Sequence, residues 1–197
     1  MNKQKLIVRA VLGLAGALLL SCTPVPEYIN PEADFAFYQK VGVIPFSNLT
    51  SDRMAAEKVT SSFTTELLMH EDIEVVNSGD FFKSVREVIK GERTNHPEEF
   101  TSEEALALGK ATQVEGVFVG AVRDYGVVRV GSDEFPLVGI IVRLYDCQSG
   151  KVVWSCEITR KGGPKFPIFS FGETHTLGEM TSKVCREAAG RFAAALK

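Results

Sequence analysis

The chain has 197 residues, of which 45% are hydrophobic and 24% charged, and its formal net charge is −3 at pH 7. That length suits one globular domain, and so weakly acidic a chain lacks the basic surface expected of a nucleic-acid-binding protein. The balance of apolar and charged residues also excludes a long disordered chain, a collagen and a disulfide-dense miniature scaffold.

The first 21 residues predict a secretory signal peptide. Three basic residues precede an apolar stretch over residues 10–20, which is shorter than the roughly 20 apolar residues of a membrane-spanning helix. The small residue Ser21 then precedes Cys22, and the sequence Leu-Leu-Ser-Cys resembles the bacterial lipobox. This resemblance implies that Cys22 becomes the mature N-terminus and carries acyl chains such as palmitate, which would anchor the protein in a membrane.

The residues after Cys22 indicate in which membrane the protein resides and predict an extended tether. In the lipoproteins that the lipobox resembles, an Asp after the cysteine often signals retention in the inner membrane, so Thr23 favours the outer membrane. Three prolines within residues 24–31 predict an extended tether. We therefore expect a signal peptide over residues 1–21, a lipidated N-terminus and tether over 22–39, and a folded periplasmic domain over 40–197.

The first half of the domain alternates short strands and helices. Residues 40–46 predict a buried strand, and residues 52–70 predict a helix that has Ser51 as its N-cap and an apolar residue at every fourth position. Residues 73–76 predict a second strand. A second helix is expected over residues 78–91, because Gly91 is a suitable C-terminal stop.

The second half of the domain predicts a run of strands between two helices. Thr101 and Glu104 fit a capping box for a short helix, and an apolar face spaced by three or four residues predicts a last helix over 177–195. The strands between them are expected at residues 116–122, 137–145 and 151–159. The order β-α-β-α-α-β-β-β-α predicts an α/β (α+β) fold, with a single mixed sheet of about five strands packed with about four helices. The first two strands should be parallel, and the last three should form an antiparallel meander.

The sequence carries no catalytic or metal-binding pattern. Its three histidines lie far apart, and none has a second His or Cys at ligand spacing. The glycine-rich phosphate loop, the dinucleotide fingerprint and the GxSxG elbow are all missing. Pairs of acidic residues fall in predicted loops or helix starts, where carboxylates are normally solvated. We therefore expect no enzyme activity, no cofactor and no metal.

Three cysteines remain in the expected domain after Cys22. A tight turn at residues 149–150 would place Cys147 opposite Val152, out of register with Cys156, so no bridge is expected between those two cysteines. A disulfide between Cys156 and Cys185 is open if the last helix covers that strand. The alternative is that all three side chains are small apolar groups in the core.

Two segments contain large apolar residues outside the predicted helices and strands, and the first of them is a predicted loop. Residues 163–172 would either fold over the sheet edge or offer an apolar surface to a membrane or a partner. Residues 124–136 look like a twisted strand extension or flap. We expect both segments to contact partner proteins, and the candidate partner-binding residues are Phe166, Ile168, Phe169, Phe171, Tyr125 and Phe135.

Three stretches carry a resemblance to known envelope proteins: residues 41–49, residues 116–120 and the hairpin over 144–154. They are similar to the curli-secretion lipoprotein family (CsgG-like), the amino-terminal domain of TolB, and the LpoB-type outer-membrane activators of peptidoglycan synthases. The resemblance spans residues 40–197. It implies a compact domain similar to anticodon-binding domains, used as a periplasmic protein-binding module, and it carries no catalytic residue.

The curli exporter of this group forms a pore, because each subunit inserts transmembrane hairpins after the third and fifth strands. Such a hairpin needs more than about 20 residues. The corresponding stretches here, residues 123–137 and 160–175, have only 15 and 16 residues and contain charges and prolines. We therefore expect the chain to keep the periplasmic domain without forming a pore.

The function that the sequence favours is a non-enzymatic lipoprotein of the cell outer membrane, whose periplasmic domain binds proteins of an envelope assembly or secretion complex. The alternatives are a subunit of a CsgG-type secretion channel, an LpoB-type activator of a peptidoglycan synthase, a purely structural lipoprotein, and an enzyme with an unrecognised site. The expected partners are the membrane, through the N-terminal lipid, and envelope proteins. A homo-oligomer is left open, and no nucleic acid is expected.

Overall fold

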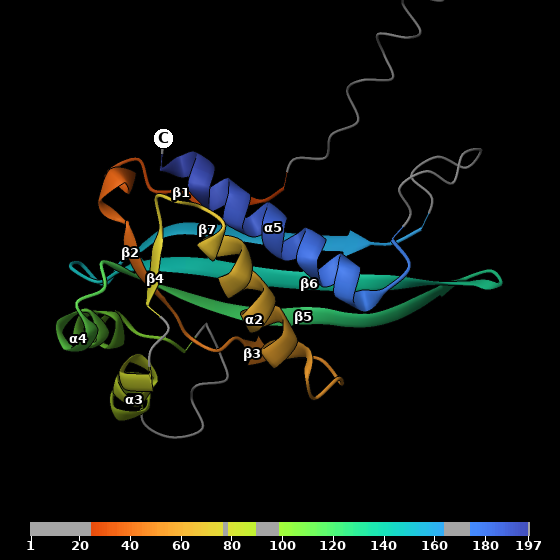
Figure 1. Ribbon diagram of the computed structural model, residues 1–197, viewed down its shortest axis with the longest axis horizontal. Helices are drawn as coiled ribbons and strands as arrows, with labels where there is room; N and C mark the ends of the chain where they lie inside the picture. The colour runs from red at the N-terminus through yellow and green to blue at the C-terminus, as the bar shows by residue number, and fades with distance from the viewer. Residues whose placement is uncertain (1–24, 77–78, 90–98, 164–173, 197) are drawn as a thin grey trace, which may run out of the picture.

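The computed structural model describes residues 25–76, 79–89, 99–163 and 174–196, and Figure 1 shows their arrangement. The strands are β1 (Glu27–Ile29), β2 (Lys40–Val43), β3 (Ser47–Asn48), β4 (Glu74–Val76), β5 (Gly116–Val130), β6 (Asp133–Asp146) and β7 (Val152–Lys161). The helices are the short 3₁₀ helix η1 (Phe35–Phe37) and the α-helices α2 (Ala55–Leu68), α3 (Gly79–Val88), α4 (Ser102–Thr112) and α5 (Leu177–Ala195). None of these described helices is long and apolar enough to cross a membrane.

The seven strands form one mixed sheet in the order β1-β7-β6-β5-β2-β4, with β3 paired to β5 beside β2. β2 runs parallel to β4 and β5, and β5, β6 and β7 form an antiparallel meander. The predicted order β-α-β-α-α-β-β-β-α is confirmed. The sheet has two more strands than expected, because β1 and β3 are too short to give a periodic signal.

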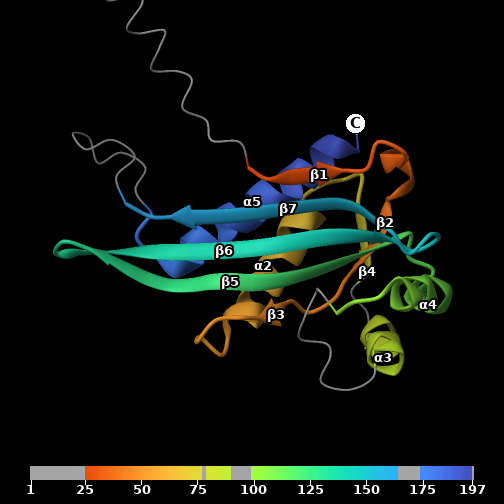
Figure 2. The same cartoon turned by 180° about the vertical axis from the view of Figure 1, so that it is seen from behind.

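The main core lies between the sheet and the helices α2 and α5, which cover one face together (Figure 1). Its largest fully buried side chains include Phe63 of α2, Trp154 of β7 and Phe192 of α5. α3 and α4 cover the opposite face only at one end, where Phe81 and Leu108 pack in a second cluster (Figure 2). Over the rest of the described part of the molecule, the helices leave that second face open.

Of the two predicted N-caps at α4 and α2, the first is confirmed and the second is wrong. At α4 the capping box is confirmed, because the Glu104 backbone N–H donates to Thr101 Oγ1 at 3.2 Å and the Thr101 N–H donates to Glu104 Oε2 at 2.7 Å. The prediction of Ser51 as the N-cap of α2 was wrong, since α2 begins only at Ala55. Here Asp52 closes a turn of its own by accepting from the Met54 N–H at 2.8 Å.

The expected tether over residues 22–39 differs most from the structure. Glu27–Ile29 is strand β1 and pairs antiparallel with β7, with Ile29 opposite Trp154. The Glu27 carboxylate accepts from Trp154 Nε1 at 2.9 Å and from Arg191 Nη1 at 3.1 Å. Prolines near a short segment indicate an extended chain, but they carry no information about a strand more than 100 residues away.

A close contact between β2 and α3 gives a test of the second cluster. A Cβ on Gly42 would lie 2.4 Å from two ring carbons of the buried Phe81. We expect Gly42→Ala to lower the free energy of unfolding by about 1–3 kcal/mol in urea denaturation, because the ring cannot move without straining its neighbours. Gly126→Ala is the matched control, since its Cβ would meet nothing within 4 Å. Equal losses in the two variants would contradict this packing.

Candidate functional site

The β5–β6 hairpin is the first candidate surface, and it contains two residues that the sequence proposed for partner binding. Tyr125 is buried at 8% exposure, and Lys58 Nζ lies 5.4 Å from its ring centroid. Phe135 is partly buried, and its ring closely approaches Gly163. Tyr125 thus packs against the domain near the base of the hairpin, whereas Phe135 lies opposite Val128, close to the turn. The other four candidates, Phe166, Ile168, Phe169 and Phe171, lie outside the described residues.

Beyond β3, the hairpin extends as a two-stranded ribbon. β5 pairs with β2 and β3 only as far as Val122, and its later residues pair with β6 until Val130 meets Asp133. Val127 and Val130 are 56% and 48% exposed. Within the described part of the chain, the outer edge of this ribbon has no neighbouring strand. The ribbon therefore offers unpaired backbone groups beside apolar side chains.

Val127 and Val130 were not among the residues predicted to contact partners, because aromatic residues were selected instead. The predicted strand extension over residues 124–136 is confirmed, since β5 and β6 pair until Val130 meets Asp133. A two-residue turn with Gly131 at φ 65° closes the hairpin. The sequence of residues 124–130 has no strict alternation of polar and apolar residues that would have identified the exposed valines.

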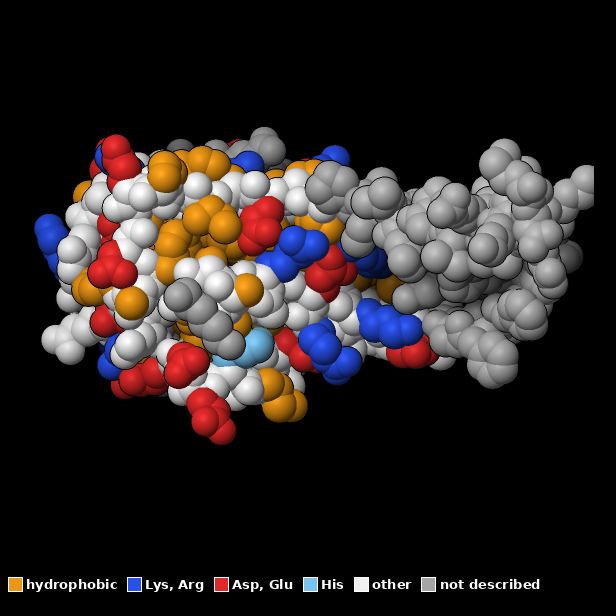
Figure 3. Space-filling model, turned by 90° about the horizontal axis from the view of Figure 1, so that it is seen from above, with side chains coloured by type: hydrophobic (Ala, Val, Ile, Leu, Met, Phe, Trp, Pro, Cys, Tyr) orange, Lys and Arg blue, Asp and Glu red, His pale blue; other side chains and the backbone are white. Residues whose placement is uncertain are grey.

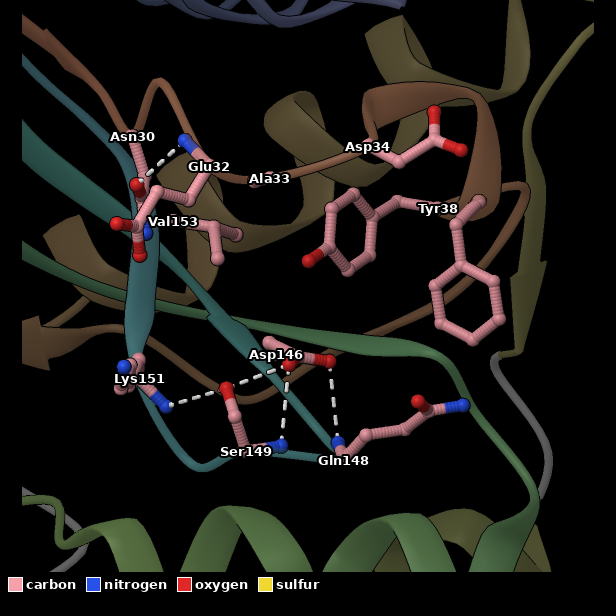
Figure 4. A pocket seen from close by; sticks show the side chains of 11 residues that line it. Asn30, Glu32, Ala33, Asp34, Tyr38, Asp146, Gln148, Ser149, Lys151 and Val153 are labelled. Atoms are coloured by element: carbon pink, nitrogen blue, oxygen red, sulfur yellow. Dashed lines mark hydrogen bonds between the residues drawn. The ribbon is translucent and has the colours of Figure 1, made fainter.

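A polar pocket of about 410 Å³ is the second candidate (Figure 4). It lies between the β6–β7 turn and the chain that joins β1 to β2. Its lining residues are Asn30, Glu32, Ala33, Asp34, Phe37, Tyr38, Asp146, Gln148, Ser149, Lys151 and Val153. Residues more than 100 positions apart in the sequence therefore share one cavity.

The carboxylate of Asp146 organises one wall of this polar pocket. It accepts from the backbone N–H groups of Gln148 and Ser149, both at 3.0 Å, and from Ser149 Oγ at 2.5 Å. These bonds hold the β6–β7 turn, which is the ordinary role of Asp in such loops. They also explain why the predicted register of this hairpin was wrong, because Val152 pairs with Tyr145 rather than Cys147.

Tyr38 faces the same pocket from the other side (Figure 4). Burial, with smaller effects from the charges of Asp146 and Asp34, raises the pKa of its hydroxyl to about 12. The hydroxyl is therefore protonated at neutral pH and can donate a hydrogen bond. No group of three or more His, Cys, Asp or Glu residues in the described chain could hold a metal ion.

An apolar groove of about 430 Å³ is the third candidate and lies beside α2. Val43, Phe46, Leu68 and Phe82 contribute its apolar lining. Three threonines of α2 also line the groove, and each hydroxyl donates to a backbone carbonyl of its own helix: Thr60, Thr64 and Thr65. Thr60 also accepts from the Phe46 N–H at 2.9 Å. Because the backbone satisfies these hydroxyls, an apolar side chain can lie against them without leaving them unpaired.

The three cysteines of the domain are free and buried, so the structure does not contain the Cys156–Cys185 disulfide that the sequence left open. Burial raises the pKa of the Cys147 and Cys185 thiols to about 12, and it also raises that of Cys156. The Cys185 thiol lies 3.7 Å from the Val59 carbonyl oxygen. These side chains act as small apolar groups of the core.

The thiols give a test by alkylation and pH. We expect iodoacetamide at pH 8.5 to leave Cys147, Cys156 and Cys185 unmodified in the native protein and to modify all three in urea, because only the thiolate reacts. These thiols have a higher pKa in the folded protein than in the unfolded chain. Their contribution to the free energy of unfolding is therefore fully present below pH 9 and is lost as the pH rises toward about 12. The free energy of unfolding should therefore fall above pH 9. Rapid native alkylation would contradict the buried assignment.

Comparison with known proteins shows the fold. No family model and no curated protein matches the chain. Among solved structures, the PelC dodecamer from Paraburkholderia phytofirmans aligns with a TM-score of 0.57 and 21% identity, over 86% of this chain and 96% of that chain. The lipoprotein GNA1162 from Neisseria meningitidis aligns with a TM-score of 0.53 and 18% identity, over 77% of this chain and 99% of that chain.

The structural likeness bears on the resemblance seen in the sequence. The C-terminal domain of LpoB from Salmonella enterica aligns over 66% of this chain and 87% of that chain, with a TM-score of 0.46 and 13% identity. The likeness to the curli-secretion family and to TolB stays an expectation. The chain thus has a fold that is also found in a bacterial lipoprotein, GNA1162.

Proposed function

We propose that the protein is a lipoprotein of the cell envelope, anchored to the outer membrane through Cys22, whose domain binds other proteins and does not catalyse a reaction. One observation carries the proposal: a signal sequence ending in Leu-Leu-Ser-Cys stands directly before a domain that shares its fold with a bacterial lipoprotein. The lipid would hold the domain at the membrane surface. The periplasmic side of the outer membrane is the location that Thr23 favours.

The β5–β6 hairpin is the surface that we assign to protein binding. It extends past the strands that flank its base, and its outer edge can accept a further strand by backbone hydrogen bonding. The exposed Val127 and Val130 would add apolar contact area, and the ion pair between Arg129 and Glu134 (2.6 Å) stiffens the ribbon near its end. This combination supports recognition of an extended segment of a partner protein.

Photo-crosslinking in cells tests the proposal directly. A photoreactive amino acid at Val127 should crosslink to a distinct envelope protein, identified by mass spectrometry. The same group at Leu49 is the control, because Leu49 is 49% exposed but follows the short strand β3. Identical products from both positions, or none from Val127, would contradict the assignment of the hairpin.

The hairpin also gives a prediction for binding affinity. The double variant Val127→Asp, Val130→Asp should weaken capture of the crosslinked partner about five- to thirtyfold, since two apolar contacts worth about 1–2 kcal/mol in sum would be replaced by hydrated charges. Both side chains are exposed, so the melting temperature should stay unchanged. Leu49→Asp should leave binding intact. Unchanged binding by the double variant would remove the hairpin from the interface.

A second candidate function is a subunit of a homo-oligomeric assembly, such as a secretion channel. PelC, which shares the fold, is described as a dodecamer, and the unpaired hairpin edge could pair with another copy of this chain. Native mass spectrometry of the purified lipoprotein separates the two functions. A closed ring would favour the assembly, and a monomer would favour the binding module. Stimulation of a peptidoglycan synthase by the purified protein would instead favour the LpoB-type alternative.

A further inference from the structure

The lipid anchor and the first strand of the sheet are separated by very little chain. Only five peptide links join Cys22 to Glu27, the first residue of β1. A fully extended chain spans at most about 3.6 Å per residue, so these two Cα atoms lie within about 18 Å of each other in any conformation. The polar layer of one leaflet is itself roughly 5–8 Å thick. Once Cys22 is acylated, β1 must therefore stay close to the membrane surface.

β1 is held firmly on the domain, so its position fixes that of the sheet. Its backbone pairs with β7, and its Glu27 carboxylate binds both Trp154 Nε1 of β7 and Arg191 Nη1 of α5. Arg191 also contacts the Glu187 carboxylate at 3.3 Å. These contacts connect the strand nearest the lipid to the main core. A constraint on β1 is thus a constraint on the whole described domain.

β1 carries two exposed large side chains at the edge of the sheet, Tyr28 on one face and Ile29 on the other. Tyr28 and Ile29 are 49% and 47% exposed, and β1 is the edge strand at its end of the sheet. Figure 3 views the molecule from the side on which β1 and α5 lie, and apolar side chains gather near the middle of that face. Tyrosine is enriched at membrane interfaces because its ring is apolar and its hydroxyl is polar.

We infer that the β1 edge, through Tyr28 and Ile29, docks on the lipid headgroup layer and orients the domain on the membrane. The inference rests on the proposed acylation of Cys22 and adds to it a defined contact surface. β3 is separated from β1 by β7, β6 and β5, which is about 19 Å at the usual strand spacing. The β3 side of the domain therefore faces away from the membrane, toward periplasmic partners.

Spin labelling of the full acylated protein tests this orientation. A nitroxide is attached to Ile29→Cys, and to Leu49→Cys as the matched control, because these side chains are 47% and 49% exposed on opposite sides of the sheet. The protein is reconstituted in vesicles of phosphatidylethanolamine and phosphatidylglycerol. The label at residue 29 should lose access to a water-soluble nickel complex several-fold and gain access to oxygen. The label at residue 49 should stay open to the nickel complex.

The outcomes distinguish the inference from the function on which it rests. Acylated protein whose two labels are equally open to the nickel complex would overturn the docking and leave the lipoprotein intact. Loss of access to both reagents at residue 29 would show that a protein, such as a second copy, covers β1, and would also overturn it. A protein without acyl chains, detected by its mass, would refute the anchor and the docking together.

Discussion

Cys22→Ser should release the protein from the membrane fraction. The thiol of Cys22 is the group to which the resemblance to the lipobox assigns the lipid. Each buried acyl CH₂ contributes about 0.8 kcal/mol, so the loss of two or more chains removes far more binding energy than surface contacts supply. Ultracentrifugation of cell lysates followed by immunoblotting measures the change.

The neighbouring residue supplies the control for this variant. Thr23→Ser keeps a small hydroxyl residue after the cysteine and should sediment with the membranes as the wild-type protein does. If Cys22→Ser sedimented to the same extent as Thr23→Ser, the lipid would not be the anchor. The weak contacts of Tyr28 and Ile29 would then be insufficient to explain the attachment, and another membrane partner would be required.

Trp154→Ala should cause the largest loss of stability among substitutions in the core. The Trp154 ring is fully buried, with its centroid 6.2 Å from that of Phe118 and 5.7 Å from that of Phe192. Its removal leaves a large cavity and deprives Glu27 of a hydrogen-bond donor. We expect the free energy of unfolding to fall by about 3–5 kcal/mol, measured by urea denaturation of the domain.

A conservative variant separates the cavity from the lost hydrogen bond. Trp154→Phe keeps most of the ring volume, while Glu27 retains its bond to Arg191, so this loss should be clearly smaller than that of the alanine variant. The two variants should also differ at the N-terminus, since only a collapsed core would release β1 from β7. A loss below about 1 kcal/mol for Trp154→Ala would contradict the central place of this cluster.

The elements with strong local signals were predictable from the sequence, and those that depend on distant pairing were not. The apolar periodicity of α5 and the capping box of α4 gave these helices correctly. β1 was interpreted as part of a tether, because a three-residue strand has no periodicity and is held by Trp154 and Arg191, which lie far along the chain. β3 has only two residues, so it gives no periodic signal either. It forms because its backbone pairs with β5, which lies far along the chain.

The candidate surfaces, too, were predictable only where the signal is local in the sequence. The sequence identified residues 124–136 as an extension, and the structure places there a regular ribbon whose exposed residues are Val127 and Val130. The alternatives of a strand extension and a flap were left open, and the pairing of β5 with β6 shows the strand extension. The polar pocket was not predicted, since Tyr38 and Asp146 meet only after the sheet has brought together the two ends of the domain.

The mass of the mature N-terminal peptide tests the central claim most directly. The protein would be purified from membranes in detergent and digested, and its first peptide analysed by mass spectrometry. We predict a peptide that begins at Cys22 and carries covalently bound acyl chains on that residue. A mature chain that begins at another residue, or an unmodified Cys22, would contradict the account.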